Sequence, residues 1–108
     1  MTTPKTETPL EPEVWSVALQ VAAIVRRVTG DPAYRVCLFG SWASGEARER
    51  SDIDIAIDGP APVTPAAMFE IRDACDALQT LYTIEVVDFA QVAPDFRREA
   101  RLVAVEPA

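Results

Sequence analysis

The segment DIDIAID, Asp52 to Asp58, constrains the fold more than any other part of this sequence. Its residues alternate with period two, which is the pattern of a β-strand with two chemically different faces. One face carries three isoleucines, and the other carries Asp52, Asp54, Ala56 and Asp58. Carboxylates two positions apart on a strand lie on the same side and repel each other unless a cation lies between them. The segment therefore predicts a sheet with one buried face and a cation site on the other.

The remaining apolar patterns predict the elements around this strand. Three- and four-residue steps from Val14 to Val28 predict a helix with Gly30 as its C-cap, starting either at a Thr8–Glu11 capping box or at Pro12. Residues 34–39 and 83–89 predict two further strands, 94–101 a short helix and 102–105 a small edge strand. After Thr64-Pro65, a second amphipathic helix is predicted from Met68, Ile71, Cys75, Leu78 and Tyr82. This order predicts an α/β (α+β) domain, a small sheet with helices packed on one side.

Composition limits what such a domain can do. The chain has 108 residues, enough for one modest core, and we expect a flexible tail at 1–12 and one domain at 13–108. A net charge of −7 argues against stable nucleic-acid binding, which depends on many Lys and Arg contacts to phosphates. No apolar run reaches the length of a membrane span and no signal peptide is visible, so we expect a cytoplasmic protein without a membrane partner. Because the chain has no histidine, His-dependent triads and His-ligated metals are excluded. Cys37 and Cys75 lie in apolar patterns and are expected to be buried free thiols.

A Gly-Ser pair, Gly40-Ser41, directly follows the strand predicted at residues 34–39. Glycine permits a sharp turn and a close approach to a ligand, and a serine hydroxyl beside free amides can bind phosphate oxygens. The hard oxygens of the aspartate pair suit Mg²⁺, and two such ions need a third carboxylate. Glu85 is the best candidate and Asp88 the alternative. A phosphate cradle joined to carboxylates is what metal-assisted transfer of a nucleotidyl group requires.

These motifs resemble those of a known family. Gly40-Ser41, then ten residues, then Asp52-Ile53-Asp54 is similar to the signature of the polymerase β-like nucleotidyltransferase superfamily. The longer string GSWASGEARERSDIDIAID, with IEVVDF near the end, resembles the minimal nucleotidyltransferases (MNT), and the resemblance covers about residues 14–106. It implies the family's fold, a small mixed sheet with helices packed on one side. Family members of this size are commonly antitoxins encoded beside HEPN-domain toxins, and the better understood ones transfer AMP from ATP to a tyrosine of that partner ribonuclease.

The resemblance also implies roles for individual residues. Asp52, Asp54 and Glu85 would be catalytic and hold Mg²⁺, with two ions expected, while Gly40 and Ser41 would bind the triphosphate of ATP. Glu85 would in addition act as the base toward the incoming hydroxyl. The family usually has aspartate where this chain has Glu85, which is longer by one methylene and shifts the position of that base.

Two loop residues are further candidates for nucleotide binding. Many relatives have an arginine where this chain has Ser44, and Arg48 or Arg50 could take its place. Ser51 is the other candidate, although its hydroxyl can instead bond the backbone where the loop enters the strand. Among neighbouring residues, Trp42 is expected to pack under the loop rather than stack on a base. Asp88 is expected in a turn or cap, and the arginines at 97, 98 and 101 on a solvated helix face.

Two functions of different classes remain open. One is an enzyme that uses Mg²⁺ to transfer AMP from ATP to a hydroxyl of a HEPN toxin, with the acceptor supplied by that second chain. The alternative is a catalytically impaired antitoxin that neutralises its partner by binding alone, because of Glu85 and Ser44. Transfer to a small molecule is a third and weaker candidate.

Overall fold

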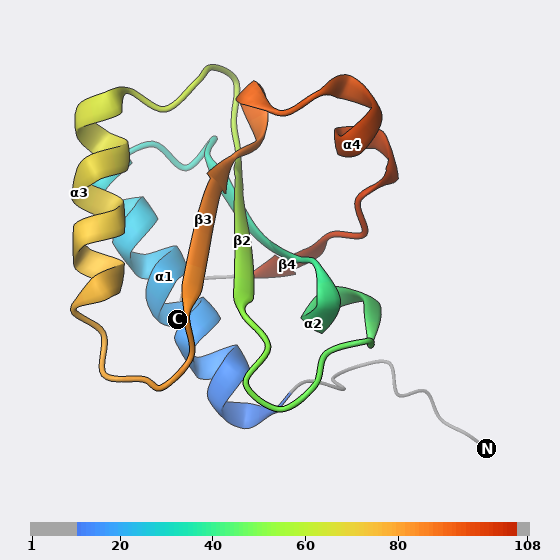
Figure 1. Ribbon diagram of the computed structural model, residues 1–108. Coiled ribbons are helices and arrows are strands. Elements are labelled where there is room, and N and C mark those ends of the chain that lie inside the picture. Colours follow the sequence, from blue (N-terminus) through green and yellow to red (C-terminus); the bar gives the residue numbers. More distant parts are fainter. Residues whose placement is uncertain (1–10, 106–108) are drawn as a thin grey trace.

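The computed structural model describes residues 11–105. Of the tail predicted at residues 1–12, residues 1–10 lie outside this part, and Pro12 already belongs to the first helix. In chain order its elements are α1 (Pro12–Thr29), β1 (Arg35–Phe39), α2 (Ser41–Ser44), β2 (Ile53–Asp58), α3 (Pro65–Asp76), β3 (Ile84–Asp88), the 3₁₀ turn η1 (Phe89–Gln91), α4 (Pro94–Glu99) and β4 (Val103–Val105) (Figure 1). The strands lie within one residue of the expected bounds. None of the described helices has both the length and the apolar character to cross a membrane.

The strands form one mixed sheet in the order β3-β2-β1-β4. β1 is antiparallel to both β2 and β4, whereas β2 is parallel to β3. The register pairs Asp54 with Phe39 on one side and with Glu85 on the other. Pairing therefore brings the second aspartate of the motif next to the residue before Gly40 and next to the predicted third carboxylate.

Helix α1 begins and ends where local chemistry predicts. Pro12 occupies the first turn, where its missing N–H costs nothing, and Gly30 adopts a left-handed φ of 66° and donates its N–H to the carbonyl of Arg26. The predicted start at Pro12 is confirmed, with Glu11 as the N-cap, and Thr8 of the alternative capping box lies outside the described residues. Seven residues of one helix face are buried, namely Val14, Val17, Ala18, Val21, Ala22, Ile24 and Val25.

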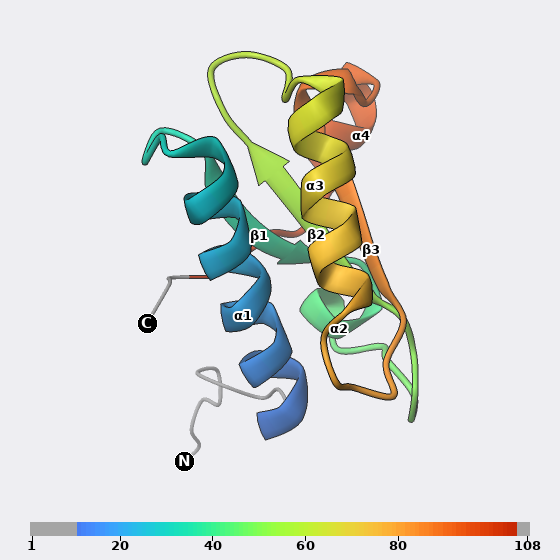
Figure 2. The ribbon, with the colours of Figure 1, turned by 90° about the vertical axis from the view of Figure 1, so that its left-hand side faces the viewer.

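Helices α1 and α3 cover one face of the sheet, as expected (Figure 2). Ile53, Ile55 and Ile57 are fully buried beneath them in the main core. Burial of such side chains contributes about 1.5–3 kcal/mol each to folding. The two long helices thus bury the isoleucine face of β2. The face with the aspartates points away from these helices.

The second amphipathic helix is shorter than the prediction. α3 ends at Asp76 with Ala77 as its C-cap, so Leu78 and Tyr82 belong to the following segment, although both pack against the core. The hydroxyl of Thr80 accepts the N–H of Tyr82, a side-chain to backbone bond that competes with helix continuation. The apolar residues at 78 and 82 therefore mark contacts with the core and not a continuation of the helix.

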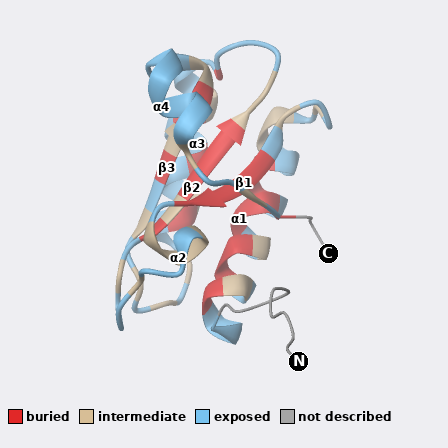
Figure 3. Ribbon diagram, turned by 90° about the vertical axis from the view of Figure 1, so that its right-hand side faces the viewer, coloured by how far each residue is buried: buried red, intermediate tan, exposed pale blue. Residues whose placement is uncertain are grey.

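The opposite face of the sheet carries a smaller apolar cluster of Cys37, Phe39, Ala56 and Phe89. Phe96 of α4 packs edge-on against Phe39 and Phe89, and 47% of it remains exposed. Figure 3 shows α4 mostly exposed while the strands beneath are buried. This face is only partly covered and can be reached by other molecules.

Candidate functional site

Three carboxylates lie on the less covered face of the sheet. Asp54 projects there because its neighbours Ile53 and Ile55 are buried on the helix side. Asp52 directly precedes β2 and shares the same side by alternation. Glu85 is the register partner of Asp54 on β3 and so projects to the same face. The structure therefore places the three predicted acidic residues on one face of the sheet.

Gly40 lies directly against the carboxylate of Asp54. A β-carbon built at position 40 would overlap Oδ2 of Asp54 and lie 3.0 Å from its Cγ. The backbone at Gly40 has φ 76° and ψ −153°, a region that side chains other than hydrogen rarely allow. The sequence analysis explained Gly40 by a close approach to a ligand. The structure gives a second reason, because the contact with Asp54 leaves no room for a side chain at this position.

Ser41 opens α2 immediately after this glycine. The helix has only four residues, and the amides of Ala43 and Ser44 both donate to the carbonyl of Gly40. No side chain caps its start, and among residues 11–105 the hydroxyl of Ser41 has no hydrogen-bond partner. A free hydroxyl and the start of a helical turn thus lie next to the carboxylates.

The electrostatics of the site disfavour charge on Asp54. Its pKa is raised above the ordinary value of 3.8, first by burial and then by the negative charges of Asp52 and Glu85. Within residues 11–105, no arginine forms an ion pair with any of the three carboxylates. The described residues therefore hold repelling charges together without a protein cation to balance them.

This donor set fits Mg²⁺ in chemistry. Carboxylate oxygens are its preferred protein ligands, and a divalent ion would remove the repulsion that raises the pKa of Asp54. In the part of the chain that is described, no three acidic or cysteine side chains already converge closely enough to form a metal site. Metal binding would therefore require the side chains to rearrange.

The loop before β2 is held by Ser51. Its hydroxyl accepts the N–H of Arg48 at 2.8 Å, and its own N–H donates to the carbonyl of Arg48 at 2.9 Å. Arg50 within this turn has a left-handed φ of 69°. These bonds match the structural role that the sequence offered as the alternative for Ser51, whereas the side chain of Arg48 is exposed at the surface.

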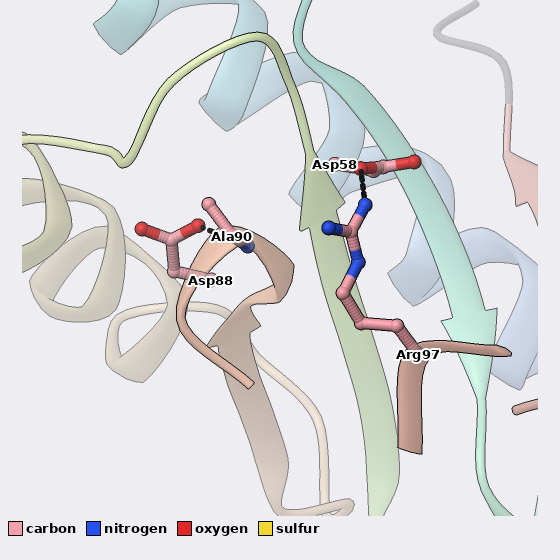
Figure 4. A network of polar contacts seen from close by, with 4 residues as sticks. All are labelled: Asp58, Asp88, Ala90 and Arg97. Atoms are coloured by element: carbon pink, nitrogen blue, oxygen red, sulfur yellow. Dashed lines mark hydrogen bonds and ion pairs between the residues drawn. The ribbon is translucent and has the colours of Figure 1, made fainter. Parts of the chain in front are cut away.

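Asp88 points to the other face of β3 and has a structural role (Figure 4). It is buried, and its Oδ2 accepts the N–H of Val63 at 2.8 Å while Oδ1 accepts the N–H of Ala90 at 3.0 Å. The expected turn and capping role is confirmed. Glu85 remains the only one of the two predicted candidates that faces Asp54.

At the far end of β2, Asp58 pairs with Arg97 of α4 at 3.3 Å (Figure 4). This pair lies on the same strand face as Asp54 but four residues further along. Within the described part of the chain, Asp58 therefore has a cationic partner of its own, unlike Asp52, Asp54 and Glu85. The alternating sequence alone did not distinguish Asp58 from the other two aspartates. Cys37 and Cys75 are buried and free, as predicted.

The polymerase β nucleotidyltransferase family model matches residues 31–103, which include β1, β2, β3 and all three carboxylates. The chain belongs to this nucleotidyltransferase family, as the spacing of its motifs predicted. It is 32% identical over 74 residues to a probable protein adenylyltransferase, MntA, of Haemophilus influenzae. That match covers 68% of this chain but only 65% of the relative, so just under two thirds of the relative's length is represented.

Solved structures share the fold at low sequence identity. One is a chain from the complex of the tri-AMPylated HEPN toxin of Shewanella oneidensis with an MNT antitoxin. It has a TM-score of 0.61 at 17% identity, over 88% of this chain and 73% of that one. Another comes from a toxin–antitoxin structure with AMP-PNP, with a TM-score of 0.55 at 20% identity, over 83% and 73% of the two chains. These likenesses confirm the small mixed sheet with its helices.

Proposed function

We propose that this protein transfers AMP from ATP to a hydroxyl of a protein partner, in a reaction that depends on Mg²⁺. The observation that carries the proposal is the gathering of Asp52, Asp54 and Glu85 on one accessible face, beside the turn at Gly40-Ser41. Burial and then the charges of Asp52 and Glu85 raise the pKa of Asp54, and a cation bound between these carboxylates would offset that repulsion. Membership in the nucleotidyltransferase family supports the reaction class.

Each residue has a distinct role in this proposal. Asp52, Asp54 and Glu85 bind Mg²⁺, and two ions are expected because three carboxylates suit a two-metal site. When bound, the metal neutralises phosphate charge and stabilises the attacking and leaving oxygens. The backbone at Gly40 and the hydroxyl of Ser41 bind the triphosphate.

The two loop residues contribute unequally. Arg48 is exposed and free to reach a phosphate oxygen from the loop. The hydroxyl of Ser51 accepts the N–H of Arg48, so Ser51 acts on the nucleotide by shaping this turn.

The chemical step is a displacement at the α-phosphorus of ATP. The acceptor hydroxyl oxygen forms a bond to the α-phosphorus, the bond to the oxygen that bridges to the β-phosphate breaks, and pyrophosphate leaves. The proton of the hydroxyl passes to the carboxylate of Glu85. Asp52 and Asp54 hold the reacting groups in line, and alignment of this kind is a large part of such catalysis.

We propose further that the acceptor is a tyrosine of a HEPN toxin and that this protein is its antitoxin. The support is the similarity to MntA of Haemophilus influenzae and to the Shewanella oneidensis complex. The half-exposed Phe96 offers an apolar contact for a second protein on this face, where it packs against Phe39, the register partner of Asp54.

The direct experiment uses α-labelled ATP with the purified HEPN protein encoded nearest to this gene. The proposal predicts label on the HEPN protein in the presence of Mg²⁺, none with EDTA, and none with the Asp54→Asn variant. Loss of transfer after mutation of the acceptor tyrosine to phenylalanine would identify the modified residue.

Neutralisation by binding alone is the second candidate. The observations that favour it are the longer Glu85 and the lack, among residues 11–105, of three acidic side chains that already converge on one metal position. In the same experiment it predicts a stable complex with the HEPN protein and no transferred label. Label on the partner would exclude it.

A further inference from the structure

Trp42 links the two halves of the candidate site. It directly follows Ser41 in α2, and its indole Nε1–H donates to the backbone carbonyl of Ser51 at 2.9 Å. Ser51 is the residue before Asp52. One side chain therefore spans the loop between the serine turn and the first carboxylate.

The same indole also contacts the segment that leads into β3. Its ring packs edge-on against Tyr82, with ring centroids 6.0 Å apart and an interplanar angle of 81°. The next residue, Thr83, accepts the backbone N–H of Ile53 at 2.8 Å. Trp42 thus touches the chain just before both strands that carry the acidic residues.

The remaining attachments of α2 are weak. The helix has four residues, none of them buried, and no side chain caps its start. Among residues 11–105, the Trp42 bond is the only side-chain hydrogen bond between α2 and the entrance of β2. The loop it spans includes Arg50 with φ 69°, a conformation that costs energy for a residue with a side chain. The bonds between Ser51 and Arg48 hold the turn within the loop, and the Trp42 bond ties that turn to α2.

We propose that Trp42 is a positioning residue that holds the entrance of β2, and with it Asp52, at a fixed separation from the serine turn. Its N–H fixes the strand entrance, and its ring fixes α2 against the segment before β3. Its effect on nucleotide binding rests on the proposed function, whereas its effect on the metal-free protein does not. The triphosphate and the metal must be held at one fixed spacing, so a small displacement here weakens both.

The test compares three variants of the full chain. Trp42→Phe keeps an aromatic ring and removes the N–H donor. Trp15→Phe is the matched control, because the other tryptophan is also half-buried against the core but lies on α1. Tyr82→Phe keeps the ring contact and removes only the phenol hydroxyl.

Two measurements are made on each variant. The first is amide hydrogen exchange of residues 41–54 in the metal-free protein, and the second is calorimetric titration with AMP-PNP and Mg²⁺. Trp42→Phe is expected to speed exchange in residues 41–54 by about tenfold and to weaken Mg²⁺-dependent binding by about tenfold. Trp15→Phe and Tyr82→Phe are expected to change neither by more than about twofold, even where the melting temperature falls.

The outcomes separate this inference from the proposed function. Unchanged exchange in Trp42→Phe, or faster exchange with unchanged binding, would overturn the positioning role. An equal effect in Trp15→Phe would also overturn it, because it would reflect general loss of packing. If the wild-type protein bound no Mg²⁺-nucleotide, the proposed function would fail, and the exchange data would still decide whether Trp42 holds the loop.

Discussion

Gly40 and Asp54 are in such close contact that the glycine has no room for a side chain. A β-carbon at position 40 would overlap Oδ2 of Asp54 and lie 3.2 Å from its β-carbon. The contact exists because Phe39 and Asp54 are partners in the β1–β2 register. The turn proposed to bind phosphate and the carboxylate proposed to bind metal are therefore one packed unit.

Gly40→Ala should disrupt this unit in two ways. The backbone conformation alone costs about 1–3 kcal/mol for a residue with a side chain, and the clash displaces the Asp54 carboxylate in addition. We expect a loss of stability in urea unfolding and at least a tenfold loss of Mg²⁺-nucleotide affinity by calorimetry.

Gly45→Ala is the matched control for this variant. Gly45 also has a positive φ, 85°, but nothing lies within 4 Å of a β-carbon placed there. It should cost about 1–2 kcal/mol through strain alone and leave the nucleotide affinity unchanged. Equal effects of the two substitutions on affinity would contradict the role of the Gly40–Asp54 contact.

Asp54→Asn should stabilise the metal-free protein while abolishing its response to metal. Burial and the charges of Asp52 and Glu85 raise the folded-state pKa of Asp54, so the fold favours its neutral form. Ionisation of Asp54 therefore removes stability as the pH rises through this raised pKa, and the neutral amide avoids that loss. At pH 7 without metal we expect a melting temperature a few degrees above wild type, a difference that vanishes below pH 3.8, where the wild-type side chain is protonated.

Addition of Mg²⁺ should make the wild type melt at a higher temperature than Asp54→Asn. The wild type gains stability by binding the ion in the folded state, and Asp54→Asn does not. Asp58→Asn is the control, since Asp58 lies on the same strand face but pairs with Arg97. If wild type and Asp54→Asn melted alike at every pH and Mg²⁺ concentration, Asp54 would have no such role.

Glu85 and Asp88 should respond oppositely to loss of charge. Glu85→Gln is expected to leave stability nearly unchanged and to reduce AMP transfer by about a hundredfold, because charge stabilisation at the metal is lost. Glu85→Asp restores a carboxylate of the length usual in the family and should retain or raise the activity. A drop with Glu85→Asp as large as with Glu85→Gln would show that the site depends on the longer side chain.

Asp88→Asn is expected to destabilise the fold and to spare the chemistry. The buried carboxylate accepts N–H groups from Val63 and Ala90, and an amide nitrogen turned toward either one cannot accept it. The loss of free energy of unfolding should be about 1–3 kcal/mol, with Mg²⁺-nucleotide affinity unchanged at a temperature where the variant is folded. Weakened metal binding in a folded Asp88→Asn protein would indicate that Asp88 is a metal ligand.

Local chemistry explains which features the sequence could predict. The alternation from Ile53 to Asp58 determines which side of β2 is buried, and Gly30 and Pro12 mark the ends of α1. The placement of Glu85 and Asp88 on opposite faces also follows from strand periodicity alone.

Features that depend on contacts between distant segments were not predictable in the same way. The overlap of Gly40 with Asp54 depends on the β1–β2 register, and the bond from Trp42 to Ser51 depends on the path of the loop. The early end of α3 could not be read from the apolar spacing, because Leu78 and Tyr82 pack against the core from outside the helix. In each case the residue type indicated that the position makes a particular kind of contact. Which residue it contacts depends on the tertiary structure.

Calorimetric titration of the wild-type protein with AMP-PNP, with and without Mg²⁺, tests most directly whether the three carboxylates and the serine turn form one site. The account predicts saturable binding that requires Mg²⁺ and is absent in Asp54→Asn. Binding of equal strength in EDTA, or no heat at any Mg²⁺ concentration, would contradict it.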